Sequence, residues 1–198
     1  MLSRTLSLSL TLAAIAITPA VLHAQSQSPN PLADRITVAA AFGGISGAAN
    51  LNDAGSADWR LGWAGSLNAT RWVLPRLGVQ VGGTWAQDSL RGTALTGRGK
   101  FNKFAYNADV VLRYPLSAGA STIAPYVLGG AGAISVHQLG SDSTWTKFAG
   151  NFGGGLEYRF SRVGVRVEGR DYVYKFDRYG FDKTQHDIAW QGGVTVSF

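Results

Sequence analysis

The sequence predicts an all-β protein in which eight antiparallel strands close into an up-and-down transmembrane β-barrel. Three observations support this fold class. Apolar and polar residues alternate with a period of two in eight successive blocks, as they do in strands with two different faces. The connections between the blocks alternate between short and long, a pattern typical of barrels that span a membrane. The apolar face is also too bulky for the interior of an eight-stranded barrel.

Amino-acid composition narrows the class of protein independently of any motif. Of 198 residues, 26 are glycine, 11% are aromatic, 15% are charged and none is cysteine. The many aromatics and few charges argue against intrinsic disorder. The absence of cysteine excludes a disulfide scaffold and a thiolate zinc site. We therefore expect one domain of ordinary size, with no cofactor and no metal.

The amino-terminal segment has the layout of a secretory signal peptide. Arg4 precedes a mostly apolar run from Leu6 to Leu22, and a polar stretch follows Ala24. A membrane anchor is the alternative, but Thr18 and Pro19 shorten an already marginal span. Removing the leader lowers the formal net charge from +6 to +5, because it carries one arginine and no acid. The predicted parts are a signal peptide at 1–24, a flexible lead-in at 25–33 and a barrel at 34–198.

The strands follow in order along the barrel segment. The alternating blocks are 34–45, 58–72, 77–87, 101–114, 122–136, 147–160, 163–176 and 187–198. In the fourth block, Phe104 and Tyr106 share one face while Lys103 and Asp109 share the other, which Val111 interrupts. The fifth block is apolar on both faces, so its orientation stays open. Short connections lie around 74–76, 115–121 and 161–162, and the other four run about ten to thirteen residues.

The size of the apolar face decides which way it points. An eight-stranded barrel has room inside only for modest side chains, and this face carries bulky ones throughout. They include Trp63, Trp85, Phe104, Tyr106, Phe152, Tyr158 and Trp190. The bulky face therefore points outward, where a continuous apolar surface requires lipid.

Aromatic residues near the strand ends predict interfacial girdles at both rims. At the short-turn rim these are Trp72, Tyr114, Phe160 and Phe198. At the long-loop rim they are Trp59, Trp85, Phe101, Trp145, Tyr174 and Phe176. Ordinary core aromatics are the alternative interpretation.

The hairpin around Ser161 and Arg162 predicts charges inside the barrel. A two-residue turn places Glu157 opposite Arg166, and it places two glycines opposite Glu168 and Arg170. Opposite charges across a strand pair attract, and glycine leaves room for a long neighbour. The predicted lumen network, which would act as a plug, comprises Lys103, Asp109, Arg113, Glu157, Arg159, Arg166, Glu168 and Arg170.

The same assignment predicts a positive excess inside the barrel. The inward cations are Arg35, Arg60, Lys103, Arg113, Lys147, Arg159, Arg166 and Arg170, and the inward acids are Asp109, Glu157 and Glu168. Any conductance through the lumen is therefore expected to favour anions.

Three segments resemble a known family. They are the hairpin segments 152–160 and 164–172, the stretch 124–132, and a last strand ending in an aromatic residue. The mature chain resembles the small outer-membrane β-barrel proteins of Gram-negative bacteria, the eight-stranded OmpA/OmpX-type group. The resemblance implies outer-membrane location and an assembly signal read by the outer-membrane assembly machinery, formed by Trp190, Val194, Val196 and Phe198. Because the chain stops at Phe198, we expect no peptidoglycan-binding domain.

The expected role is structural or interactive: envelope integrity, adhesion or binding through the long loops of a monomer. A narrow anion-preferring pore is the first alternative, and a soluble, lipocalin-like barrel with an apolar cavity is another. Basic loop residues that could meet lipopolysaccharide phosphates are Arg91, Arg98, Lys100, Arg178 and Lys183. Nucleic acid is not an expected partner, because the basic residues are spread over the chain.

A barrel enzyme acting on lipid or peptide at the outer leaflet is the remaining alternative. The candidate residues lie in two long connections and are His137, Ser141, Asp142, Ser143, His186 and Asp187. Catalysis would require a nucleophile and a base within hydrogen-bond reach, and no spacing in the sequence indicates this. We expect no enzyme and no catalytic residue.

Overall fold

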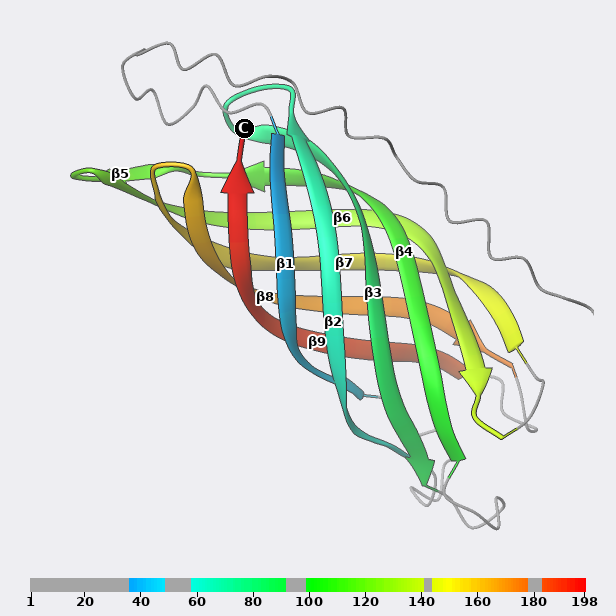
Figure 1. Ribbon diagram of the computed structural model, residues 1–198. Coiled ribbons are helices and arrows are strands. Elements are labelled where there is room, and N and C mark those ends of the chain that lie inside the picture. The colour runs from blue at the N-terminus through cyan, green and yellow to red at the C-terminus, as the bar shows by residue number, and fades with distance from the viewer. Residues whose placement is uncertain (1–35, 49–57, 92–98, 141–143, 178–182) are drawn as a thin grey trace, which may run out of the picture.

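The computed structural model describes residues 36–48, 58–91, 99–140, 144–177 and 183–198. Figure 1 shows strands that cross one another at a steep tilt and wrap into a closed barrel. The predicted signal peptide and lead-in lie outside the described residues. Within the described ranges, no helix is long and apolar enough to cross a membrane.

Nine strands form one antiparallel sheet, and eight of them close it into a barrel. The strands are β1 Ile36–Gly47, β2 Asp58–Trp72, β3 Leu77–Arg91, β4 Gly99–Arg113, β5 Leu116–Ala118, β6 Ser121–Gln138, β7 Thr144–Phe160, β8 Val163–Phe176 and β9 Lys183–Ser197. The order is β4-β3-β2-β1-β9-β8-β7-β6-β5, and the β4–β6 pairing completes the ring. The eight-stranded up-and-down barrel is confirmed.

The additional strand β5 lies within a predicted connection. It spans three residues and pairs only with the beginning of β6 among the described strands, continuing the sheet where β4 ends. Figure 1 shows this hairpin projecting from the end of the barrel that also holds the chain's C-terminus. The short turns β2–β3 and β7–β8 lie at this same end, which we call the short-turn end, and the long connections lie at the opposite long-loop end.

Several strands are longer than the alternation predicts. Strand β3 continues to Arg91, and β9 begins at Lys183. The predicted blocks ended at residue 87 and began at residue 187. Most of the extra residues are polar and resemble loop composition, but in a closed barrel the neighbouring strands supply their backbone hydrogen-bond partners. This extension moves Asp88 inside a strand and sets Asp187 well within one.

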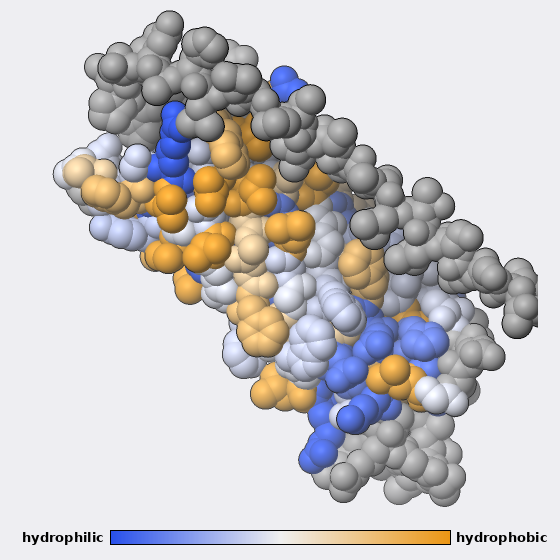
Figure 2. Space-filling view, viewed as in Figure 1, coloured by the Kyte–Doolittle hydropathy of each residue, from blue (hydrophilic) through white to orange (hydrophobic). Residues whose placement is uncertain are grey.

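The outer wall of the barrel is apolar, as predicted. Side chains of the bulky face are largely exposed, for example Phe152 at 57%, Trp85 at 54% and Trp190 at 52%. Figure 2 shows apolar side chains across the middle of this wall and hydrophilic side chains gathered toward the long-loop end. Lipid therefore has a continuous apolar band to contact, and the outward orientation of the bulky face is confirmed.

The predicted girdles are only partly correct. Tyr114, Phe160 and Phe198 at the short-turn rim and Trp85 at the long-loop rim point outward and are exposed. The side chains of Trp59 and Phe176 lie outside the described residues. Four other members point inward and are corrections to the prediction: Trp72, Phe101, Trp145 and Tyr174.

The alternation of inward and outward side chains along each strand (strand parity) explains why these aromatic residues point inward. Phe101 has the parity of Lys103, so its side chain points to the other face of β4 from the outward Phe104. Nearness to a strand end does not therefore place an aromatic residue in lipid. Phe101, Trp145, Tyr172 and Tyr174 instead join a buried apolar cluster that fills the long-loop end of the lumen.

The structure also settles the orientation of the fifth predicted block, now β6. Tyr126, Leu128, Ile134 and Val136 are buried in the lumen, while Val127 is exposed on the wall. Val111 is inward as predicted and packs with Tyr126 and Leu128. The lumen is consequently lined by larger side chains than the sequence alone indicated.

Candidate functional site

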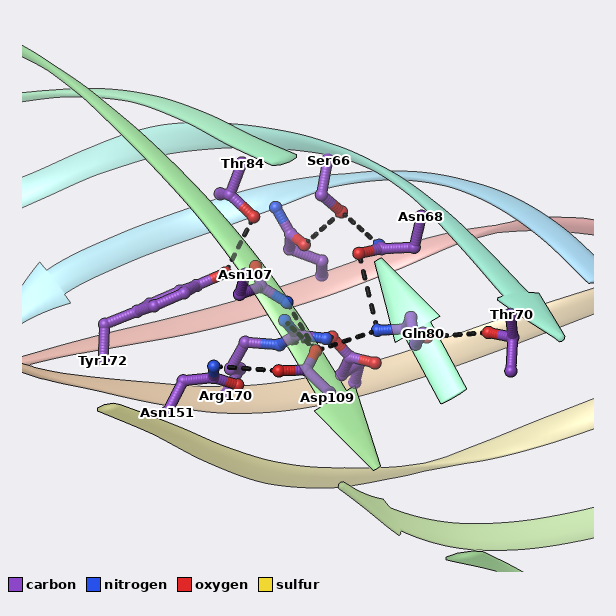
Figure 3. A network of polar contacts seen from close by, with 12 residues as sticks. Ser66, Asn68, Thr70, Gln80, Thr84, Asn107, Asp109, Asn151, Arg170 and Tyr172 are labelled. Atoms are coloured by element: carbon purple, nitrogen blue, oxygen red, sulfur yellow. Dashed lines mark hydrogen bonds and ion pairs between the residues drawn. The ribbon is translucent and has the colours of Figure 1, made fainter. Parts of the chain in front are cut away.

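The middle of the lumen is a polar network centred on Asp109 (Figure 3). Its carboxylate accepts hydrogen bonds from the amides of Gln80 at 3.3 Å, Asn151 at 2.9 Å and Asn107. Arg170 contacts the same carboxylate at 3.1 Å. The partners come from β3, β4, β7 and β8, so this one buried acid links opposite walls of the barrel.

Glu168 continues the network toward the short-turn end. Its carboxylate forms ion pairs with Arg170 at 3.1 Å and with Arg166. The Tyr126 hydroxyl donates to Glu168 at 2.9 Å and accepts from Arg166 Nε at 3.0 Å. Such fully connected ionic networks are stable in a low-dielectric interior because each charge has partners.

The predicted register of the β7–β8 hairpin is confirmed. Glu157 lies opposite Arg166, and Gly155 lies opposite Glu168. The lack of a side chain at Gly155 is required, because a Cβ there would lie 2.5 Å from the Tyr126 hydroxyl oxygen. The ion pairs, however, do not join the residues that lie opposite each other across the two strands. Arg166 pairs with Glu168 along its own strand, and Glu157 lies 3.9 Å from Arg159.

Two arginines close the short-turn end of the lumen. Arg159 donates to the Ser197 hydroxyl at 3.1 Å. Arg113 donates to the Pro75 carbonyl at 3.1 Å, and its guanidinium lies 3.5 Å from the ring centroid of Trp72. Between this layer and the central network lies a cavity of about 20 Å³, which has room for about one water molecule.

A different cluster occupies the long-loop end. Lys103 lies between two aspartates, with Nζ 2.8 Å from Asp88 and 2.7 Å from Asp187. Tyr174 donates to Asp187 at 3.0 Å, and Gln185 donates to it at 3.4 Å. All three charged side chains are essentially inaccessible to solvent. Lys103 was expected to join Asp109, but its ion pairs are with acids that the predicted network omitted.

The predicted positive excess is wrong for the described residues. Their buried charged side chains comprise five cations and five anions: Lys103, Arg113, Arg159, Arg166, Arg170, Asp88, Asp109, Glu157, Glu168 and Asp187. Arg35 lies outside the described residues. Arg60 is exposed, because a register shift in β2 lies between it and Trp63. Lys147 is partly exposed and pairs with Asp177 at 2.6 Å.

Sequence reasoning missed Asp88, Asp187 and Tyr126. The alternation of inward and outward residues could have indicated both aspartates. Asp88 continues the alternation of Gln80 and Thr84, and Asp187 continues that of Gln191. Extending each pattern past the apolar block would have found them. Tyr126 carried no such signal, because its strand is apolar on both faces.

The candidate catalytic residues that the structure describes do not form one site. His186 lies on the outer wall, where Nδ1 is 2.8 Å from Asp171, while Asp187 points into the lumen. His137 contacts Thr144 at 2.8 Å, and residues 141–143 lie outside the described part of the chain. No cluster of metal-ligating residues occurs among the described residues.

The outward residues of the last strand form an apolar row. Trp190, Val194, Val196 and Phe198 are exposed on the wall by 52%, 54%, 36% and 65%. Among the basic residues expected at the outer surface, Lys100 is exposed at the long-loop end. Arg98 and Arg178, together with the side chains of Arg91 and Lys183, lie outside what the structure describes.

Comparison with known proteins identifies the family. Residues 9–198 match the family model described as "Outer membrane protein beta-barrel domain". The chain belongs to this family. It is therefore an integral β-barrel protein of the Gram-negative outer membrane. No curated protein sequence is a significant match.

Solved structures of similar fold come from three groups of bacteria. Neisserial surface protein A is 15% identical with a TM-score of 0.59, covering 82% of this chain and 97% of that one. The Yersinia pestis attachment invasion locus protein Ail is 14% identical with a TM-score of 0.47, covering 83% and 99%. The N-terminal barrel of Pseudomonas aeruginosa OprF is 15% identical with a TM-score of 0.43, covering 83% and 98%. At 15% identity, the likeness to Neisserial surface protein A shows the fold alone.

Proposed function

We propose that this outer-membrane barrel has a structural or surface-interaction role and that its lumen is closed to ion flow. The observation that carries the proposal is the occupied lumen. Arg166, Glu168, Arg170 and Asp109 bridge its middle, and the aromatic cluster fills its long-loop end. A structural or binding role requires a stable barrel with exposed loops, whereas a pore requires a continuous aqueous path.

The charges buried inside the barrel do not support an anion-preferring pore. The buried cations and anions of the described residues balance, so these charges provide no net attraction for anions. Catalysis likewise gains no support, since the described candidate groups point to different sides of the wall. The role of a surface protein is therefore the better supported one.

Single-channel recording in planar lipid bilayers tests the closed lumen. We expect no conductance steps from the wild-type barrel. The double variant E168A/R170A removes two side chains that span the middle, and we expect it to produce steps. Regular conductance steps from the wild type would overturn the closed lumen. Unchanged ion selectivity of those steps in E168A/R170A would show that Glu168 and Arg170 do not line the conducting path.

A second experiment separates structural from surface roles. Segments 49–57 and 92–98 can be replaced by short Gly-Ser turns in cells that lack the native chain. If envelope integrity is the role, we expect the trimmed barrel to restore detergent resistance. If loop binding is the role, the trimmed barrel is expected to reach the membrane but lose surface attachment. Failure of the full-length chain to affect either property would contradict the proposal.

The proposed partners follow from the surface of the barrel. Lys100 and the other basic residues of the long-loop end are proposed to contact lipopolysaccharide phosphates. The apolar row ending at Phe198 is proposed to be read by the outer-membrane assembly machinery, and the barrel is proposed to be a monomer. Replacing Phe198 with Ser tests the second point, with the amount of barrel in the outer membrane as the measurement.

A further inference from the structure

A groove interrupts the lipid-facing wall where β7, β8, β9 and β1 lie side by side. Its volume is about 610 Å³, and its apolar lining includes Phe42, Leu156, Val167 and Trp190. The groove is shallow and open, so an occupant would lie along the wall. The groove lies about half-way along the strands, within the apolar band that faces lipid.

Outward glycines form the floor of the groove. Gly154 and Gly169 lie directly opposite each other on β7 and β8. Gly192 lies on β9, between Val167 of β8 and Phe42 of β1. Around this floor, Phe42 is 65% exposed and Trp190 is 52% exposed. Large side chains thus border a groove whose floor includes three residues without side chains.

A polar pair stands above the groove on the same wall. Asp171 lies two residues from Gly169 toward the long-loop end, about 7 Å along the strand. His186 Nδ1 lies 2.8 Å from Asp171 Oδ2, and the His186 side chain is 43% exposed. The other carboxylate oxygen, Oδ1, is buried and accepts no hydrogen bond from the described residues.

This pair is unusual for its position. Charged groups on the lipid face of a barrel are unfavourable, least so near the interface. An exposed imidazole that a carboxylate holds in place is chemically suited to a phosphate headgroup. With a proton on each ring nitrogen, the imidazole can donate to Asp171 through Nδ1 and to a phosphate through Nε2.

We propose that this wall holds one phosphorylated membrane lipid, with an acyl chain in the glycine-floored groove and its phosphate at His186. The proposal rests on the outer-membrane location of the barrel but not on the closed lumen. Ion-current recordings therefore test the function independently of this site.

A lipid fits the groove better than a second copy of the chain. The outer wall of a barrel is convex, so two barrels touch along a narrow strip, and neither could fill a depression in the other. An acyl chain is narrow and flexible, and it already surrounds this surface. The polar pair also lies on the headgroup side of the groove, in line with a chain that descends toward the middle of the bilayer.

Native mass spectrometry of the detergent-solubilised barrel, titrated with phosphatidylglycerol, tests the proposal. The variant G169L fills the groove, and a Cβ at Gly169 has no heavy atom within 4 Å. The matched control is G129L, another outward glycine, where the nearest atom to a Cβ is 3.8 Å away. For the headgroup, H186Q is compared with H137Q, whose histidine contacts Thr144 at the same end of the barrel.

We expect the wild type, G129L and H137Q to retain one phosphatidylglycerol each. G169L is expected to bind about tenfold more weakly, comparable to losing roughly two buried methylene groups. H186Q is expected to lose the preference for phosphatidylglycerol over diacylglycerol, which has no phosphate. Heat-modifiable gel migration confirms that every variant is folded.

Three results would overturn all or part of the proposal. Equal lipid retention by G169L and G129L would show that the groove holds no specific chain. A wild-type dimer that G169L converts to a monomer would show that the occupant is a second copy of the barrel. Retention of phosphatidylglycerol by H186Q at the wild-type level would remove the assigned phosphate contact.

Discussion

The two halves of the lumen are filled by different chemistry. The middle is a polar network in which Asp109, Glu168, Arg166 and Arg170 share partners with amides and with Tyr126. The long-loop end is an apolar cluster of aromatic and aliphatic side chains, crossed by one lysine between two aspartates. Both halves are buried, but the acids of the first contact several cations and amides, whereas the two aspartates of the second share one lysine.

This difference predicts that the two halves tolerate amino-acid substitutions unequally. In the middle, a lost contact can be compensated by neighbouring donors and acceptors. At the long-loop end, Lys103 is the cation that the structure places against both Asp88 and Asp187. Breaking a buried ion pair by removing one partner is costly because it leaves an uncompensated charge. Three substitutions, measured by urea unfolding of the barrel in lipid vesicles, test whether the two halves differ in this way.

The largest effect is expected for Lys103→Met. Two buried carboxylates lose their shared cation, and the free energy of unfolding should fall by about 3–5 kcal/mol. Lys147→Met is the matched control, because the Lys147–Asp177 pair is 29% and 41% exposed, and a surface pair contributes only about 0–1 kcal/mol. The triple variant K103M/D88N/D187N should recover part of the loss. Equal effects of K103M and K147M would contradict the assigned role of Lys103.

A smaller loss is expected for Phe101→Ala. The Phe101 side chain is fully buried, with its ring centroid 6.2 Å from that of Trp145, and truncation should cost about 3 kcal/mol through the cavity it leaves. Phe104 is its counterpart on the lipid face of the same strand and is 49% exposed. Phe104→Ala should cost less than about 2 kcal/mol, because lipid refills the space. The reverse order would show that the aromatic residue faces lipid after all.

The smallest loss is expected for Tyr126→Phe in the central network. This change removes one hydroxyl that joins Glu168 and Arg166, and a hydrogen bond to a charged group contributes about 1.5–3 kcal/mol. We expect the lower value, since both charged groups keep their ion pair. Tyr106→Phe, on the exposed wall, should leave unfolding unchanged. A loss as large as that of K103M would mean that the two halves do not differ in tolerance.

Much of this site was predictable from alternation and turn length. The hairpin register follows from the two-residue turn, so the sequence alone was sufficient to place Glu157, Glu168 and Arg170 in the lumen. Asp88 and Asp187 were missed because the apolar pattern ends before the strands do. Position near a strand end suggested that Phe101 and Trp145 face lipid, although strand parity determines the face.

The number of long strands, their order, the end at which the short turns lie and the lipid-facing wall could all be inferred from the amino-acid sequence. These features depend on local periodicity and on residue volume, which are properties of each segment. The charge pairs across the lumen, the position of the groove and the orientation of Tyr126 became known only from the folded barrel. Closure brings together side chains from strands far apart in the chain, and their contacts depend on the relative stagger of those strands, which no single segment encodes.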